Sequence, residues 1–474
     1  MLDQLEPLIR GLYPYADTHG VIRDLPEQGR PTDEILEELR AIAKNEDSAW
    51  EGGLCSGSMY SGDHEHYAFL NAVCSLFSHV NALQRDMCPS MTRFESDVIA
   101  MALDIMHGAE VTRRDASQKA CGAFGFGGTE SIINPLLVYR DKFKKERGID
   151  RPKIIVPDTA HPAFPKGAHL LGIEVVVAPT NDVTTKVDVD FVRDHVDDQT
   201  IAIVGSAGNY PYGTIDPISE LSDLAVERGV GLHVDGCLGG FILPFGEALG
   251  YDIPVFDFRL PGVTSISADT HKYGYGLKGT SVVLYRDASF RKHQYYITPE
   301  WKGGIYASNG LAGSRSGGLI AATWAAMVRY GREGYERYAK QIFETAFRMQ
   351  AAVKELGLVM MGDPTFCFSF RSNDFDIYHV NDFMKTRGWR FNGQQHPASI
   401  HMCVTRPQTQ PGVVDAFERD LKDAVAYAHE HKDEKPQTSA IYGGGATAGL
   451  PLDSPEAIEQ LMVLAIDTLQ AYPF

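Results

Sequence analysis

The stretch from Ser265 to Thr280, SISADTHKYGYGLKGT, lies between two runs that have the pattern of buried strands. Residues 263–268 alternate apolar and small side chains, and residues 281–285, SVVLY, form a short apolar run. The turn-rich loop between them carries Lys272 and Lys278. A lysine at the end of a buried strand can lose its proton and attack a carbonyl group, because desolvation lowers the pKa of an amine. The alternative is an ordinary solvated lysine in a surface loop. The neighbouring motifs distinguish a reactive lysine from a solvated one.

Short β-branched runs alternate with helical stretches, such as residues 218–228, through the middle of the chain. The further runs are 153–156, 174–177, 201–204 and 231–235. Near-continuous apolar strands that alternate with helices predict an α/β fold with a mostly parallel central sheet flanked by helices. Active sites of such sheets lie at the carboxyl ends of strands, where Asp235 and the pair His271-Lys272 are expected.

We expect the chain to be organised in three parts. Residues 1–78 form an N-terminal arm, residues 79–330 a large domain around the parallel sheet, and residues 331–474 a smaller C-terminal α+β domain. The small domain is predicted from a long helix, two short strands and a further helix, at 334–356, 366–370, 399–404 and 413–429. A glycine- and serine-rich stretch in the arm, residues 52–62, is either a flexible linker or a loop that presents Tyr60 to a site.

Composition and charge limit the classes of function. The chain has 474 residues, 44% of them hydrophobic, and a formal net charge of −18, which argues against a nucleic-acid binder and a basic membrane-surface protein. Seven cysteines without paired spacing suit a reducing compartment. We find neither a signal peptide nor a membrane span, and expect a cytoplasmic protein. The two His-Glu-His triplets lack the spacing of a zinc site, so we expect no metal.

Three features taken together predict the cofactor. Gly128 and Thr129 lie in GGTES (127–131), before an apolar helix whose N-terminus could hold a phosphate, although such a glycine turn is often only a turn. Asp235 needs a partner where it is buried: an arginine, a backbone cap, or the protonated nitrogen of an aromatic cofactor. A phosphate cradle, an aspartate after one strand and Lys272 after a later one fit pyridoxal phosphate, which needs a phosphate site, a charge on its ring nitrogen and an amine for its aldehyde.

The sequence SADTHKYGY (267–275) closely resembles the lysine motif of the sphingosine-1-phosphate lyases. These are pyridoxal phosphate enzymes of fold type I, related to the group II amino-acid decarboxylases. Further similar motifs follow in order: GGTES (127–131), HVDxCLGGF (233–241), GGIYAS (303–308), AGSR (312–315), FDIY (375–378), SIH (399–401), IYG (441–443) and, in the arm, SGxxY (56–60). The resemblance covers the chain from about residue 25 to beyond residue 442.

The resemblance implies a role for each matching residue. Lys272 would form the internal aldimine, Asp235 would pair with the ring nitrogen, and His161 would stack on the ring. Four residues would hold the cofactor phosphate, the last of them reaching in from a second subunit: Gly128, Thr129, His271 and Ser314. Four would line the pocket for the substrate phosphate: Tyr60, Asn81, Lys278 and Tyr442. The chain departs from the family at Gln84, where a histidine is usual.

The resemblance also implies the reaction, which is cleavage of the C2–C3 bond of sphingosine 1-phosphate to a long-chain aldehyde and phosphoethanolamine, in a homodimer with shared active sites. The base for the C3 hydroxyl stays open between Lys272, Tyr442 and the substrate phosphate. Two alternatives also stay open. One is a group II amino-acid decarboxylase on the same scaffold, which would not need Lys278 or Tyr60. The other is a non-catalytic cofactor-binding protein, against which the intact set of Lys272, Asp235 and His161 argues.

Overall fold

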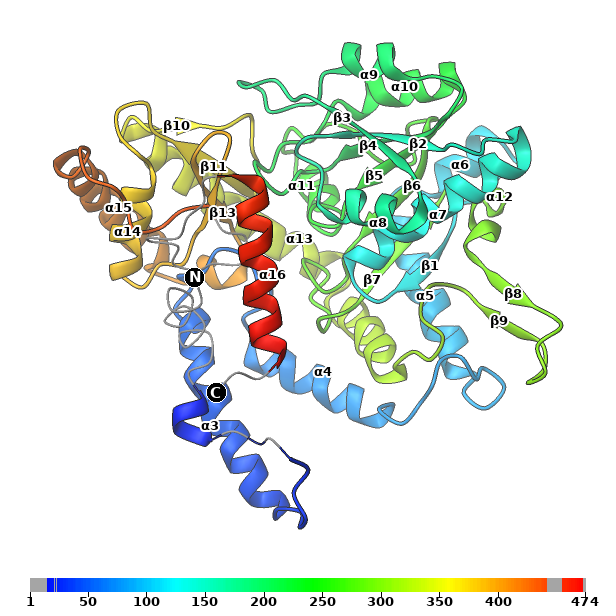
Figure 1. Cartoon of the computed structure of the whole chain (residues 1–474), viewed down its shortest axis with the longest axis horizontal. Coiled ribbons are helices and arrows are strands. Elements are labelled where there is room, and N and C mark those ends of the chain that lie inside the picture. Colours follow the sequence, from blue (N-terminus) through cyan, green and yellow to red (C-terminus); the bar gives the residue numbers. More distant parts are fainter. Residues whose placement is uncertain (1–14, 21, 23, 441–453, 472–474) are drawn as a thin grey trace.

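The computed structural model describes residues 15–20, 22, 24–440 and 454–471. Its larger part is built on a seven-stranded sheet with the strand order β1-β7-β6-β5-β4-β2-β3 (Figure 1). The strands are β1 (Cys121–Gly125), β2 (Lys153–Pro157), β3 (Glu174–Ala178), β4 (Thr200–Ser206), β5 (Gly231–Asp235), β6 (Val263–Ala268) and β7 (Ser281–Tyr285). From β6 to β3 all neighbours pair in parallel, whereas β7 is antiparallel to both β6 and β1. The predicted, mostly parallel sheet is confirmed.

The antiparallel strand β7 has a simple cause. A parallel return usually runs through a helix that crosses the sheet, whereas the chain between β6 and β7, residues 269–280, forms a turn-rich loop without a helix. This loop contains Lys272 at the end of β6, so the central lysine lies at the carboxyl edge of the parallel strands. Asp235, the last residue of the neighbouring strand β5, lies at the same edge.

Helices cover both faces of this sheet (Figure 1). Ile154 and Val204 point to one face and join a cluster with α7 and α8, whereas Ile155 and Ile203 point to the other face and pack with α10. This alternation follows from the two-residue period of a strand. The helices of this part are α5 (Ser90–Ile105), α6 (Ala109–Arg114), α7 (Gly128–Arg147), α8 (Ala163–Leu171), α9 (Val189–His195), α10 (Ile218–Arg228), α11 (Leu243–Ala248) and α12 (Ala288–Arg291).

A second sheet forms the smaller C-terminal part. It is antiparallel, with the order β10-β11-β13-β12, and is covered by α14 (Tyr378–Thr386) and α15 (Val413–Glu430). Its strands are β10 (Val359–Met360), β11 (Cys367–Arg371), β12 (Asn392–Gln394) and β13 (Ser399–Cys403). The long helix α13 (Gly317–Glu355) joins the two parts, and Gly331, at φ 54°, interrupts its helical backbone. The division at residues 78 and 330 stays a prediction, although this interruption lies beside the second boundary.

The arm folds back onto the C-terminal part. Helix α3 spans Thr32–Glu51, and α4 (His64–Leu76) packs along α13. Between them the glycine-rich loop is bound to the small sheet, because Gly57 donates its N–H to the Cys403 carbonyl at 2.9 Å and Ser56 Oγ accepts from Cys403 N–H at 2.9 Å. The loop is therefore an ordered wall rather than a flexible linker.

The remaining elements are short helices, one hairpin and the C-terminal helix. They are α2 (Tyr15–His19), the 3₁₀ helices η1 (Lys292–Gln294) and η2 (Arg406–Thr409), the hairpin β8 (Tyr296–Thr298) and β9 (Tyr306–Ser308), and α16 (Pro455–Ala471). The hairpin projects away from the main body (Figure 1). Among the described residues, no helix is both long and apolar enough to cross a membrane.

Candidate active site

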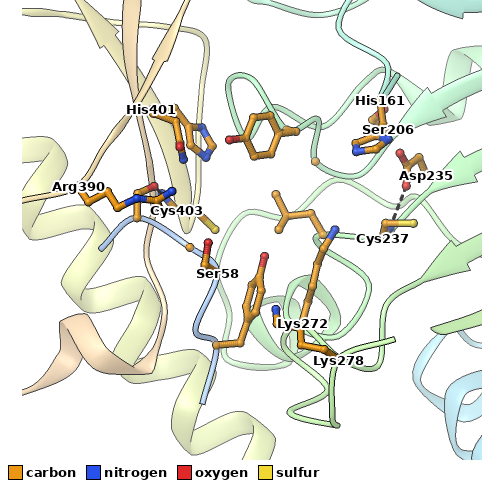
Figure 2. Close-up of a pocket in the computed structure, with 17 residues that line it drawn as sticks. Ser58, His161, Ser206, Asp235, Cys237, Lys272, Lys278, Arg390, His401 and Cys403 are labelled. Atoms are coloured by element: carbon orange, nitrogen blue, oxygen red, sulfur yellow. Dashed lines mark hydrogen bonds between the residues drawn. The ribbon is translucent and has the colours of Figure 1, made fainter. Parts of the chain in front are cut away.

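A cavity of about 240 Å³ lies where the arm loop, the carboxyl edge of the large sheet and the small sheet meet. Figure 2 shows its two sides. His161, Ser206, Asp235 and Cys237 lie on one side, and Ser58, Arg390, His401 and Cys403 lie on the other. Both lysines of the central loop, Lys272 and Lys278, lie between them. The predicted reactive lysine is thus brought to a cavity together with the predicted aspartate and histidine.

Lys272 is held by a carboxylate from its own loop. Its Nζ lies 3.0 Å from Oδ2 of Asp269, three residues earlier. Burial alone would lower the pKa of Lys272, but the carboxylate of Asp269, with smaller contributions from Tyr60 and Asp235, raises the pKa well above its ordinary value. In the free protein the Lys272 side chain is therefore an ammonium group, tied to Asp269.

Asp235 is a buried anion with defined partners. Its Oδ1 accepts from the Cys237 backbone N–H at 3.0 Å and from Ser267 Oγ at 3.2 Å. Burial would raise its pKa, but His161 and the Cys237 N–H outweigh that effect and lower it, so the carboxylate stays ionised. As an ionised carboxylate in the cavity wall, the group can pair with the protonated nitrogen of an aromatic ring.

His161 lies on the same side as a neutral ring. Its Nδ1 accepts from the Ala163 backbone N–H at 3.1 Å, which places the ring proton on Nε2. Burial lowers the pKa of His161, and the nearby Asp235 only partly opposes this. A neutral, partly buried imidazole at the cavity wall suits stacking on a flat ligand.

The start of α7 has the features of an anion site. Gly127 precedes the helix at φ 92°, and no side chain caps the first turn. A Cβ on Gly128 would lie 2.6 Å from Asp269 Oδ2, so only glycine fits there. His271 is tied through Nδ1 to the Thr280 carbonyl at 2.5 Å, and burial lowers its pKa. Gly128, Thr129 and His271 do not line the cavity itself, although the Lys272 loop connects them to it.

Two predicted residues lie elsewhere. Asn81 donates from Nδ2 to Ser314 Oγ at 2.9 Å, and its Oδ1 accepts the Arg315 N–H at 3.2 Å. Neither Asn81 nor Ser314 lines the cavity of its own chain. Gln84, at the position of the family's histidine, donates its backbone N–H to the Asn81 carbonyl. Tyr442 lies outside the described residues.

The mouth of the cavity holds the second lysine. Lys278 Nζ lies 4.8 Å from the centre of the Tyr60 ring, and the Lys278 side chain keeps contact with solvent. Partial burial of its ammonium lowers the pKa of Lys278 to about 8, and the charge of Lys272 adds to this effect. Burial raises the pKa of Tyr60 well above its ordinary value, so its phenol stays protonated and can donate a hydrogen bond.

Sequence reasoning missed several residues of this cavity. They are Ser206, Tyr210, Arg390, Asn392, His401 and Cys403. Ser206 ends β4, so the rule that placed Asp235 could have found it. His401 lies inside a motif that was recognised but given no role. Arg390 comes from the small part and reaches the cavity only through its pairing with the arm, where its N–H bonds the Leu54 carbonyl at 2.9 Å.

Comparisons with known proteins identify the family. Residues 16–363 match the pyridoxal-dependent decarboxylase conserved domain. A sphingosine-1-phosphate lyase of Dictyostelium discoideum is 43% identical over 431 residues, covering 90% of this chain and 79% of the relative. One from Arabidopsis thaliana is 44% identical over 397 residues, covering 83% of this chain and 72% of the relative.

Solved structures agree with these relatives. A sphingosine-1-phosphate lyase of Burkholderia pseudomallei superposes with a TM-score of 0.91 at 58% identity, covering 97% of this chain and all of the other. A glutamate decarboxylase of Lactobacillus brevis superposes with a TM-score of 0.73 at 21% identity, over 89% of this chain and 97% of the other, and shares the fold alone. The fold-type prediction is confirmed. The chain belongs to the sphingosine-1-phosphate lyases, a family of pyridoxal-phosphate-dependent enzymes.

Proposed function

We propose that this protein cleaves the C2–C3 bond of sphingosine 1-phosphate and of similar phosphorylated long-chain bases. The products are a long-chain aldehyde and phosphoethanolamine. The observation that carries this proposal is the pair of lysines in one cavity. Lys272 supplies an amine beside Asp235 and His161, and Lys278 supplies a separate positive charge at the mouth.

The residues around Lys272 fit pyridoxal phosphate. Its phosphate suits the uncapped start of α7, where glycine leaves room, and the ionised carboxylate of Asp235 suits a protonated ring nitrogen. When bound, the cofactor supplies an aldehyde that links to amines and a ring that accepts the electron pair of the breaking bond. His161, as a neutral ring, would hold the cofactor ring in place.

The residues at the mouth fit the substrate phosphate. The protein is acidic overall, so a dianionic substrate needs a local positive charge. Lys278, with a pKa of about 8, is mostly charged at neutral pH and serves as a point charge for phosphate, and the Tyr60 phenol can donate to it. A decarboxylase acting on an unphosphorylated amino acid has no need for this pair, so the mouth favours the lyase.

The three candidates for the base that acts on the C3 hydroxyl all stay open. Tyr60 stays protonated because burial raises its pKa, so it acts as a donor rather than a base. Lys272 can take this role when its amine is not linked to the cofactor, because its side chain lines the cavity. Tyr442 and the substrate phosphate stay open as the other candidates.

We also propose a homodimer whose two active sites are shared. Ser314 and Asn81 bond each other away from their own cavity, which is expected of residues that serve the site of a second subunit. Large apolar side chains are exposed on the projecting hairpin, at 64% for Tyr296, 59% for Trp301 and 81% for Ile305, and a partner would cover them. A cytoplasmic location is supported by seven cysteines that are all free thiols.

One assay tests the proposed reaction. Purified protein loaded with pyridoxal phosphate is incubated with sphingosine 1-phosphate, and the long-chain aldehyde and phosphoethanolamine are both quantified. We expect equal amounts of the two products. A protein that releases no aldehyde, but releases carbon dioxide from an amino acid, would reject the lyase in favour of the decarboxylase.

A further inference from the structure

The carboxyl group of Asp269 has so far been described only as the partner of Lys272. It is buried, at 2% exposure, between Lys272 and the first residue of α7. Its Oδ2 lies 3.0 Å from Lys272 Nζ and 3.8 Å from His271 Nε2. The backbone of Gly128 approaches so closely that a Cβ there would lie 2.6 Å from Oδ2 and 2.9 Å from Oδ1.

One oxygen of this carboxyl group has no partner. Among the described residues, Asp269 Oδ1 is fully buried and makes no hydrogen bond. A buried carboxylate oxygen without a donor is costly, so such an atom marks a place where a proton or a ligand is missing. The atom faces the start of α7, the place where the cofactor phosphate is expected.

Lys272 carries a proton that it must lose before it can react. Its pKa is raised by Asp269 against the effect of burial, so the free protein holds it as an ammonium. An ammonium has no lone pair, and only the neutral amine attacks an aldehyde. The ion pair with Asp269 therefore fixes the Lys272 side chain and also prevents it from attacking the aldehyde, until the ammonium loses a proton.

The arrival of a phosphate dianion changes this balance. A second anion that lies closer to the Asp269 carboxylate than to the Lys272 ammonium favours the uncharged pair, because it repels the carboxylate more strongly than it attracts the ammonium. The nearest proton is on Lys272, 3.0 Å away. His271 is a poorer source, because burial lowers its pKa and leaves its ring neutral.

We propose that Asp269 accepts a proton from Lys272 when the cofactor phosphate reaches the start of α7. The Nζ–H bond breaks and an O–H bond forms on Asp269, so the pair changes from two charges to none, and no proton is exchanged with solvent. Lys272 becomes a neutral amine, and the new O–H of Asp269 donates to the phosphate. Phosphate binding thereby activates the lysine, and Asp269 is a catalytic residue for cofactor attachment.

Infrared difference spectroscopy tests the protonation directly. Apoprotein labelled with [¹³C]aspartate is compared before and after addition of pyridoxine 5′-phosphate, which carries the phosphate but no aldehyde, so that no imine forms on Lys272 to take the proton back. We expect the carbonyl band of a protonated aspartic acid to appear in the wild-type protein and to be missing in Asp269→Asn. Asp420→Asn is the matched control and should keep the band, since Asp420 is a buried carboxylate on α15 that accepts from Trp389 Nε1. No new band in the labelled wild-type protein would overturn the proposal, whether or not the variant folds.

The kinetics of cofactor attachment give an independent test. Apoprotein is mixed with saturating pyridoxal phosphate, or with pyridoxal, which lacks the phosphate, and the linkage at Lys272 is trapped with borohydride at a series of pH values. We expect the wild-type rate with pyridoxal to rise with pH, and the rate with pyridoxal phosphate to be nearly flat and about tenfold or more faster at neutral pH.

In Asp269→Asn the two pH profiles should have the same shape. A wild-type protein whose two profiles already coincide, or a variant that keeps them different, would overturn the proposal. Neither test uses sphingosine 1-phosphate, so a failure of the proposed lyase reaction would not affect the result.

Discussion

The cofactor side of the cavity, around Asp235, is buried and joined by hydrogen bonds within one sheet, whereas the mouth, around Lys278, is open to solvent and is built from distant segments. On the buried side each charge has a close partner, such as Asp269 for Lys272. At the mouth, Ser58 and Arg390 are exposed, and Gly57 and Ser58 hold left-handed backbone at φ 61° and 63°. We therefore expect the buried side to perform the chemistry and the mouth to select the substrate.

The largest expected effect lies on the buried side. Lys272→Ala should abolish essentially all turnover and the visible absorbance of the bound cofactor, because the other lysine that lines the described cavity, Lys278, lies at its solvent-exposed mouth. Absorbance spectra and the product assay measure both effects. An active Lys272→Ala protein would contradict the whole assignment.

The second prediction tests whether the site is shared between subunits. Lys272→Ala and Ser314→Trp should each be inactive alone, the second because a bulky side chain at the start of α13 fills the space of the partner's cofactor phosphate. In a heterodimer of the two variants, one of the two sites has both residues intact. Mixing the refolded or co-expressed variants should therefore restore part of the activity, and heterodimers that form but stay inactive would argue against a shared site.

The third prediction separates the mouth from the buried side. Lys278→Ala should keep the cofactor absorbance but lose about 1.5–3 kcal/mol of phosphate binding, roughly ten- to a hundredfold in kcat/KM on sphingosine 1-phosphate. The loss should shrink on an unphosphorylated analogue. Equal losses of kcat/KM on both substrates, or no loss on either, would mean that Lys278 only caps the loop at the surface. The decarboxylase would then be the better interpretation.

The difference between the buried side and the mouth also explains which elements could be predicted from the sequence. Strands β5, β6 and β7 lie at the predicted residues, because a strand buried on both faces is a near-continuous apolar run. Strand β1, CGAFG, was missed because two of its five residues are glycines, which weaken any strand pattern.

The residues that form the mouth were harder to predict, because contacts between segments far apart in the sequence bring them together. Nothing in the local sequence of Arg390 links it to Ser56, more than three hundred residues earlier, yet their backbones bond at 2.9 Å. No separate role was predicted for Asp269, because it lies inside the lysine motif and its sequence position does not distinguish it from its neighbours. Its burial, and the close approach of Gly128, become visible only once α7 and β6 lie side by side.

The smallest expected effect is a pH dependence at the mouth. The pKa of Lys278 is lowered to about 8, so its ammonium is present below that pH and is lost above it. The substrate phosphate is already a dianion there, since its second pKa is about 6. We therefore expect kcat/KM to fall as the pH rises through about 8, down to the level of Lys278→Ala. Lys278→Arg is the matched control, because a guanidinium stays charged over this range and should remove the fall. A fall that persists unchanged in Lys278→Arg would assign the titration to another group.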